Sequence, residues 1–454
     1  MMPQQRAAAR ISKRAGAAGF LGTLIEYFEF ASYGLLMIVI APQFFPSHSQ
    51  ATSILSGLLV FATAYVVRPL GGIFFGWVGD RRGRKVALIA TVVPMGAASV
   101  VLGLLPTYAT VGVIAPILLV IVRLVQGFSA GGEIIGAATY VAESAPKRRR
   151  GFYAALTPMG SNTGVGLAGV VAGVIALSTT SAQMEAWGWR IPFLLCLPLT
   201  LITLWVRAGL EDSPEFEKMV EKSEITKAPF LTAVRAMPAN IARVAVFALV
   251  TNLIGAVGST YMAIHLISDI GMKQADVFLL MGLMQAVTIG GMLLSGRLSD
   301  RIGKPRMLSI GFTVSLIVAV PVFWVIDTAP GIGVLAVLIA VWQFAVGLQA
   351  PPMFGIFTEM FPRHIRYSAV AFGYSIGVIF GAGLTPYASQ LLAKTGSSFA
   401  PAYLVVAASA AGLVVLYFSR RISNYFNDAD RDSENGVTAR PPDDLIERDR
   451  TSMT

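Results

Sequence analysis

Apolar runs of about twenty residues recur along the chain, separated by short segments rich in charged or turn-forming residues. Each run is long enough to cross a hydrocarbon core of about 30 Å as a helix. Polar and apolar positions do not alternate, as they would in the strands of a membrane barrel. The pattern predicts twelve transmembrane helices, approximately at residues 17–43, 53–78, 86–105, 111–141, 152–177, 189–208, 241–267, 276–298, 306–327, 331–359, 367–393 and 399–419.

Composition agrees with a chain that lies in a lipid bilayer. Of its 454 residues, 55% are hydrophobic and only 13% are charged. Soluble domains carry about 25% charged residues, so the pattern indicates an all-α polytopic membrane protein. The first apolar run follows a basic segment but is too long for a signal peptide and lacks a small-residue cleavage site, which predicts an uncleaved first span.

Basic residues are distributed unevenly between the two ends of the predicted helices. Lys273, Lys394 and Arg190 lie at one side, Arg68 and Arg123 lie within helices, and all other Lys and Arg residues lie at the side that holds both termini. Because such residues accumulate in cytoplasmic loops, this side is predicted to be the cytoplasm. The net charge of +10 is thereby explained, and a nucleic-acid partner is not expected.

The same pattern divides the chain into five segments. They are a cytoplasmic N-terminus at 1–16, a six-helix bundle at 17–208, a cytoplasmic linker at 209–240, a second six-helix bundle at 241–419, and a disordered cytoplasmic tail at 420–454. The linker is charged and amphipathic, which predicts a surface helix. The tail is polar and shows no sustained heptad.

Two loop motifs occur twice, once in each predicted bundle. GWVGDRRGRK at 76–85 is repeated as GRLSDRIGKP at 296–305, and ESAPKRRR at 143–150 is repeated as EMFPRHIR at 359–366. Equivalent loops thus recur at a nearly constant offset. The repetition indicates six plus six helices, related by an axis along the membrane normal.

These loops are predicted to form a cytoplasmic gate. Glycine permits tight turns, an acid can sit at a helix N-terminus, and basic side chains can pair with acids of neighbouring helices in one conformation and release them in another. Simple turn formation with topogenic charge is the alternative. The candidate gate residues are Gly76, Asp80, Arg81, Gly83, Arg84, Lys85, Glu143, Arg150, Gly296, Asp300, Arg301, Gly303, Glu359 and Arg366.

The motifs resemble those of the major facilitator superfamily of secondary transporters. Its loop signature GxxxDRxGRK is complete at 76–85, and its fourth-helix signature RxxQG stands at Arg123, Gln126 and Gly127. VRPLGG, RLVQGFSAGGE, WGWRIPF, LEDSPEF and EMFPRHIRYS are similar to the metabolite:proton symporter family of ketoglutarate, citrate, shikimate and proline/betaine carriers. The resemblance implies a major facilitator fold with twelve transmembrane helices in two six-helix pseudo-repeats.

Four charged residues lie within predicted helices of the first half. Glu26 and Glu29 belong to GTLIEYFEF, where the family typically shows Glu-aromatic-aromatic-Asp-Phe. From the helical rise, Glu26, Arg68 and Arg123 all lie about 15–20 Å from a membrane face. Transporter sites of this architecture lie near the midplane, where ionisable residues are functional by default. A buried network that only fixes helix packing is the alternative.

Burial and charge act in opposite directions on such carboxylates. Burial favours the protonated form, whereas a nearby arginine favours the charged form. The opposition predicts a carboxylate that exchanges protons near neutral pH, with Glu26 as the carrier and Glu29 tuning it. Glu133, near the cytoplasmic edge of the fourth helix, is a third candidate for proton coupling, and a mere boundary position is its alternative.

The second half carries amides and aromatic rings where the first half carries charges. Guanidinium binds carboxylate bidentately, which favours an anionic substrate held by the first half and recognised in shape by the second. The predicted substrate-binding residues are Arg68, Arg123, Gln126, Asn252, Tyr261, His265, Gln343 and Tyr374.

The predicted function is import of a small organic acid (a mono-, di- or tricarboxylate, or a shikimate-like acid) by proton symport through alternating access in the plasma or inner membrane. Import of a zwitterionic osmolyte such as proline or betaine is the alternative, and it would predict a coiled-coil tail. A proton-driven exporter is less favoured, because Val165 stands where antiporter signatures carry proline.

Other classes of protein find little support in the sequence. HExxH, CxxC and GxxxxGK[ST] do not occur, and Cys196 is the single cysteine. We therefore expect no enzyme activity, metal, cofactor or nucleotide. The expected partners are a small-molecule substrate, protons and the lipid bilayer, with the chain acting as a monomer.

Overall fold

The computed structural model describes residues 3–144, 150–210, 212, 234–235, 237–328, 331–361, 363–395 and 398–419. Most of the chain in these ranges is helical, and the ranges contain no strand. Among the described residues, eleven helices are long and apolar enough to span a membrane, and a bent pair near the N-terminus gives a twelfth when it is counted as one span. The twelve predicted spans are thereby confirmed.

The first half contains six spans, several of them broken. Its elements are α1 (Pro3–Leu35), α2 (Met37–Phe44), α3 (Gln50–Arg82), α4 (Arg84–Leu104), α5 (Tyr108–Val111), α6 (Ile114–Ala130), α7 (Glu133–Ser144), α8 (Arg150–Ser178), α9 (Ser181–Ala186), the short 3₁₀ turn η2 (Gly188–Arg190) and α10 (Ile191–Ala208). The axis turns by 69° between α1 and α2, which together form the first span.

The second half repeats this plan. Its elements are α13 (Pro238–Ala256), the π-helical η3 (Val257–Tyr261), α14 (Met262–Ser268), α15 (Gln274–Ile302), α16 (Lys304–Ile326), α17 (Ile332–Gly347), α18 (Ala350–Glu359), α19 (Arg363–Val378), the π-helical η4 (Ile379–Leu384), α20 (Thr385–Thr395) and α21 (Ala400–Ser419). The break between α17 and α18 falls beside Pro351 and Pro352, which cannot donate backbone hydrogen bonds.

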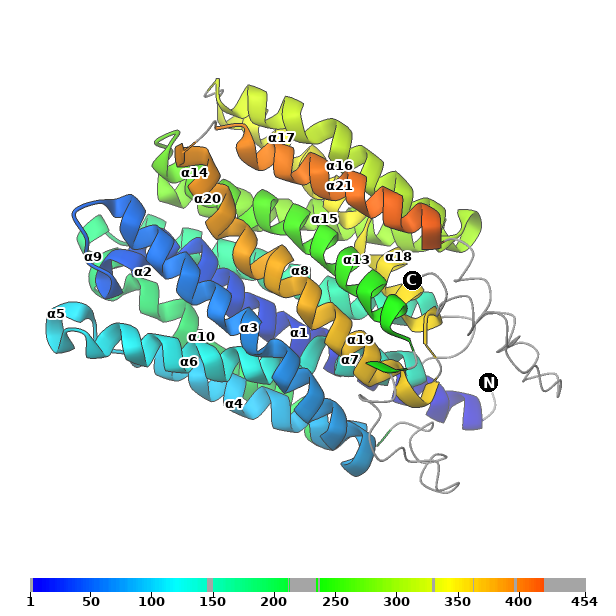
Figure 1. Cartoon of the computed structure of the whole chain (residues 1–454). Coiled ribbons are helices and arrows are strands. Elements are labelled where there is room, and N and C mark those ends of the chain that lie inside the picture. The colour runs from blue at the N-terminus through cyan, green and yellow to red at the C-terminus, as the bar shows by residue number, and fades with distance from the viewer. Residues whose placement is uncertain are drawn as a thin grey trace.

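The start of α1 and the end of α21 lie at the same end of the bundle, as an even number of spans requires (Figure 1). The predicted cytoplasmic N-terminus is continuous with the first span, because α1 already begins at Pro3. Most of the predicted linker and the whole predicted tail lie outside the described residues.

The halves pack on each other along two pairs of helices, α8 with α15 and α3 with α19. Glycines allow the first pair to approach closely. A Cβ atom at Gly169 would lie 2.6 Å from the Cα of Gly282, a contact that no larger residue tolerates. This close packing places residues of both halves around one central cavity.

Candidate functional site

A cavity of about 170 Å³ lies between the two halves. Helices α1, α3, α7 and α8 bound it on one side, and α13, α15, α17 to α19, η3 and η4 on the other. Its polar and aromatic lining consists of Tyr27, Phe30, Phe61, Tyr65, Ser161, Asn162, Thr251, Asn252, Ser259, Thr260, Gln285, Gln343, Phe354 and Tyr374. Among the described lining residues no side chain is charged, so the cavity wall is aromatic and amide-rich.

Two buried ion pairs lie behind this wall in the first half. An Nη2 nitrogen of Arg68 on α3 lies 2.9 Å from Glu26 Oε1, and Arg123 Nη1 on α6 lies 2.7 Å from Glu29 Oε1. All four side chains are buried. The four charged residues that were predicted to lie at a similar depth are therefore close together. The structure pairs each glutamate with a different arginine.

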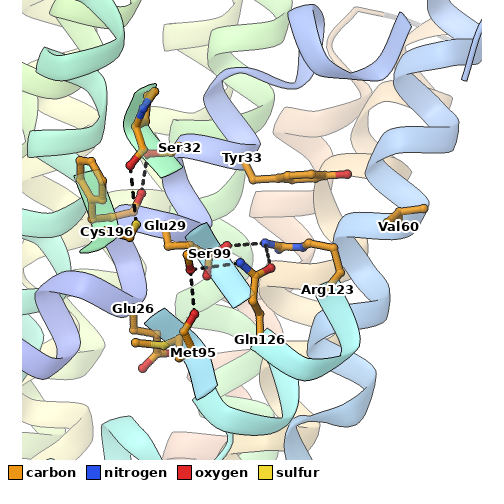
Figure 2. A network of polar contacts seen from close by, with 12 residues as sticks. Glu26, Glu29, Ser32, Tyr33, Val60, Met95, Ser99, Arg123, Gln126 and Cys196 are labelled. Carbon is orange, nitrogen blue, oxygen red and sulfur yellow. Dashed lines mark hydrogen bonds and ion pairs between the residues drawn. The ribbon is translucent and has the colours of Figure 1, made fainter. Parts of the chain in front are cut away.

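The Arg123 pair belongs to a short polar network (Figure 2). Arg123 donates to Gln126 Oε1 at 3.1 Å, and Gln126 donates to the hydroxyl of Ser99 on α4 at 3.2 Å. Gln126 thus orients the arginine and does not line the cavity. The network ties three helices of the first half around Glu29.

Aromatic rings lie against both guanidinium groups. The guanidinium carbons of Arg68 and Arg123 lie 4.5 Å and 4.6 Å from the ring centroid of Phe30. Arg68 also lies 4.5 Å from the ring centroid of Tyr65, and Arg123 lies 4.3 Å from that of Tyr33. Such stacking stabilises a desolvated cation by about 2 kcal/mol. Because Phe30 and Tyr65 also line the cavity, they stand between the arginines and any bound solute.

The two pairs leave buried polar atoms without hydrogen bonds. Among the described residues, these atoms include both carboxylate oxygens of Glu26, Oε2 of Glu29, Nε of Arg68, and Nε and Nη2 of Arg123. A buried charged group without full compensation is costly. Such a site is stabilised when it takes up a proton or a further ligand.

Glu133 lies in a third, differently built pair. It is fully buried at the start of α7, where it pairs with Arg207 of α10 and accepts a hydrogen bond of 2.5 Å from Thr91 on α4. Arg207 also donates to the carbonyl of Leu88. The pair packs against Gly22 of α1, where a side chain would collide with it. Glu133 therefore lines neither the cavity nor an exposed boundary.

The predicted residues of the second half fall into two groups. Asn252, Gln343 and Tyr374 line the cavity. Tyr261 and His265 lie outside the cavity lining, stacked on each other with ring centroids 5.7 Å apart. The imidazole of His265 bridges two acids near the ends of spans, with Nδ1 2.9 Å from Asp269 Oδ2 and Nε2 3.1 Å from Asp327 Oδ1. Sequence reasoning missed both acids, because each lies at a helix end where charge is unremarkable.

Sequence reasoning also missed Tyr27, although it stands between Glu26 and Glu29. Its hydroxyl oxygen lies 3.4 Å from that of Tyr374, so that the two rings meet across the boundary between the halves. The alternation of acids and aromatic residues in GTLIEYFEF was the available signal. That alternation singles out the acids but assigns no role to the ring between them.

The predicted gate glycines serve in two ways. Gly83 and Gly303 have φ of +101° and +90°, a region that glycine alone adopts without strain, so both copies of the motif make the same turn. Gly76 faces Tyr367 of α19, whose ring would lie 3.0 Å from an added Cβ. At Gly296 an added Cβ would meet nothing within 4 Å, and this copy of the motif holds no such ring.

Tyr367 joins the halves at the end of the bundle that holds the repeated loops. Its hydroxyl donates to the carbonyl of Gly132 at 3.0 Å, and the guanidinium of Arg84 lies 5.3 Å from its ring centroid. Arg84 of the predicted gate therefore takes part in a contact between halves. The acid predicted to pair with this cluster, Glu143, has its side chain outside the described residues.

The remaining gate candidates make local contacts, are exposed, or have side chains outside the described residues. Lys304 pairs with Glu359, which ties α16 to α18 within the second half. The backbone N–H of Lys85 donates to Asp212 at 3.0 Å, and Arg81 stacks on Trp77. Asp300 and Arg301 are exposed. The side chains of Asp80, Arg150 and Arg366 lie outside the described residues.

Two helical bundles that enclose a cavity, with buried charges beside it, are the arrangement expected of a secondary transporter. The family model described as Major Facilitator Superfamily matches residues 19–373. The chain belongs to this superfamily and is embedded in a membrane through its multiple spans.

Related proteins and solved structures agree with this family assignment. The proline/betaine transporter of Escherichia coli K12 is 33% identical over 421 residues, which cover 88% of this chain and 82% of that protein. The shikimate transporter of the same strain is 33% identical over 389 residues, covering 84% and 88%. The proton:xylose symporter XylE, solved with 6-bromo-6-deoxy-D-glucose, superposes with a TM-score of 0.75 at 18% identity, covering 91% of this chain and 96% of that one. The last likeness concerns the fold alone.

Proposed function

We propose that the chain imports a small zwitterionic solute of the proline or betaine type by proton symport, as a single chain in the plasma or inner membrane with both termini in the cytoplasm. The observation that carries this proposal is the uncharged, aromatic and amide-rich wall of the central cavity. A solute without net charge needs no charged partner there. Its cationic group can be stabilised by aromatic faces, and the named activity of the proline/betaine relative supports the same class.

Proton coupling is assigned to Glu26 and Glu29. Both are buried, both face an arginine, and both carry oxygens without a hydrogen bond among the described residues. Protonation of either glutamate releases a positive charge on its arginine partner next to the cavity. The cycle can thus pass through states in which the proton site and the solute site are filled together.

Import of a small organic acid, favoured by the sequence, stands as the second candidate. Two observations support it: the amides of Asn162, Asn252, Gln285 and Gln343 suit a hydroxylated acid, and a shikimate transporter is among the relatives. Against it stands the wall of Phe30 and Tyr65, which covers the Arg68 that was expected to bind the anion directly.

Charge balance separates the two candidates. A zwitterion that moves with one proton carries one positive charge, whereas a monocarboxylate with one proton carries none. An inside-negative potential of 100 mV therefore supports about 50-fold accumulation of the zwitterion and none of the monocarboxylate. Proteoliposomes with the purified protein would be given labelled glycine betaine, proline or shikimate under a potential alone, a pH gradient alone, or neither.

We expect glycine betaine or proline to accumulate under either driving force. Accumulation of shikimate under the pH gradient, with neither zwitterion taken up, would replace this proposal by the second candidate. Equilibration without accumulation for all three solutes would overturn proton coupling itself. Protein-free liposomes and a proton ionophore provide the controls.

A further inference from the structure

Two tyrosine hydroxyl groups, one from each half, meet at the cavity wall. Tyr27 of α1 and Tyr374 of α19 both line the cavity, and their oxygens are 3.4 Å apart. An O–H···O hydrogen bond is normally about 2.7–2.8 Å long, so this pair is loosely joined. Only one of the two hydroxyl hydrogens can lie between the oxygens, which leaves a donor for a ligand.

The Glu26–Arg68 pair lies behind the same wall of the cavity, because Glu26 directly precedes Tyr27 in the chain and Arg68 stacks on the cavity-lining ring of Tyr65. Arg68 and Glu26 each interact electrostatically with both tyrosines. Arg68 is also bound to Glu26 at 2.9 Å and covered by Tyr65, so that its charge acts on the cavity through the field and not through direct contact. When Glu26 is ionised, the two charges of the pair largely cancel at the tyrosines.

We propose that Tyr27 and Tyr374 form a carboxylate subsite whose affinity is set by the protonation state of the Glu26–Arg68 pair. The two hydroxyls donate to the two oxygens of one carboxylate, which replaces their weak mutual contact by two charge-assisted hydrogen bonds. The inference rests on the proposed function and deepens it: it places the acidic end of the solute, which zwitterions and organic acids share.

Uptake of a proton by Glu26 leaves the charge of Arg68 uncompensated beside the subsite. The carboxylate then binds more tightly, and by linkage the bound carboxylate raises the affinity of Glu26 for its proton. This reciprocity is what a symporter needs, because proton and solute stabilise each other in the loaded state.

The other groups that face Glu26 leave this balance in place. They are Glu29 on its own helix, Glu133 of α7 and Tyr65 of α3. Glu29 is compensated by Arg123, and Glu133 by Arg207. A change of charge at Glu26 therefore acts most strongly on its ion-pair partner Arg68, and it also reaches the two tyrosines.

The subsite also connects the halves. One hydroxyl comes from α1 and the other from α19, so a bound carboxylate draws the two bundles together at the cavity. Arg68 acts here as a positioning residue, and the two tyrosines are the groups that contact the carboxylate of the solute. The arrangement makes closure of the cavity depend on the presence of the acidic group.

The test compares solutes with and without a carboxylate. Binding of glycine betaine and choline, and of shikimate and its methyl ester, would be measured by calorimetry on purified wild type, Tyr27→Phe, Tyr374→Phe and the control Tyr387→Phe. Tyr387 lies on α20, half-buried and outside the cavity lining. Each phenylalanine variant at the subsite should weaken binding of the free acid about 10-fold and leave choline or the ester unchanged. Tyr387→Phe should bind all probes like the wild type.

The linkage to Glu26 is tested by pH. Wild type should bind the carboxylate more tightly as pH falls, whereas Glu26→Gln should bind tightly at every pH. Normal binding of carboxylates by both tyrosine variants, or the same pH dependence in Glu26→Gln and wild type, would overturn the subsite while leaving transport intact. If wild type binds neither glycine betaine nor shikimate, the proposed function fails instead.

Discussion

The two halves of the molecule share one helical plan but differ in what they bury. The first half holds three buried Glu–Arg pairs, on α1, α3, α6, α7 and α10. In the described part of the second half, the ion pairs lie at helix ends: Lys304 with Glu359, and His265 with Asp269 and Asp327. The two copies therefore share their turns and helices, whereas the buried Glu–Arg pairs of the described residues lie in the first copy.

The buried pairs of the first half also differ from one another. Both carboxylate oxygens of Glu133 are engaged, by Arg207 and Thr91. Glu26 and Glu29 keep oxygens without hydrogen bonds among the described residues. A carboxylate whose two oxygens both accept hydrogen bonds ties helices together, although Nε of Arg207 has no hydrogen-bond partner among the described residues. An incompletely compensated pair can exchange a proton at smaller cost, which is why we assign coupling to Glu26 and Glu29.

The largest expected effect concerns coupling. Glu26→Gln or Glu29→Gln should abolish accumulation driven by a proton gradient, so that the solute only equilibrates, because an amide cannot carry the proton. Exchange of labelled for unlabelled solute should persist in both variants. Glu185→Gln, on the exposed α9, is the matched control and should accumulate solute like the wild type. Full accumulation by both buried variants would contradict the assignment of proton coupling to the first half.

The next effect concerns stability. Arg207→Met leaves Glu133 as an unpaired buried charge and should lower the free energy of unfolding by about 3–5 kcal/mol. The double variant Glu133→Leu, Arg207→Met should recover most of this loss, since it removes both charges. Thermal unfolding in detergent measures the change.

Glu133 itself remains a candidate for coupling until it is tested. Glu133→Gln keeps an acceptor for Thr91 and Arg207 but cannot ionise. If this variant is stable and yet loses proton-driven accumulation, Glu133 belongs with Glu26 and Glu29. Our assignment expects the opposite, with accumulation retained.

A smaller effect concerns the turns that the halves share. Gly303→Ala places a side chain at a φ of +90° and should cost about 1–2 kcal/mol. Gly296→Ala, seven residues earlier in the same motif, lies within helix α15 with open space around its Cα and should be neutral or stabilising by up to about 1 kcal/mol. Equal effects in the two variants would contradict the assignment of the repeated glycine to a turn.

The smallest effect is expected at His265. Because this residue lies outside the cavity lining, His265→Gln should change the KM for solute less than about twofold. A tenfold change in uptake kinetics would show that the outer end of the second half takes part in solute binding. Gln343→Leu, inside the cavity, provides the contrasting variant and should raise KM.

Much of this molecule follows from the sequence alone, for a simple physical reason. A helix that crosses a bilayer must be apolar over its length, so the spans, their number and the charged exceptions Glu26, Glu29, Arg68 and Arg123 are visible as a pattern. The repeated glycine at the helix ends is visible for the same kind of reason, since only glycine adopts its backbone conformation without strain.

Only the tertiary structure decided which of these groups meet. Helical periodicity gives the face of each residue but not the neighbouring helix it faces, so the sequence could not pair Glu26 with Arg68 or Glu29 with Arg123. Arg207, counted by sequence among the basic residues at the cytoplasmic side, is fully buried beside Glu133. Tyr27 and Tyr374 are almost 350 residues apart in the chain, and their hydroxyls meet because the two bundles close on a shared cavity.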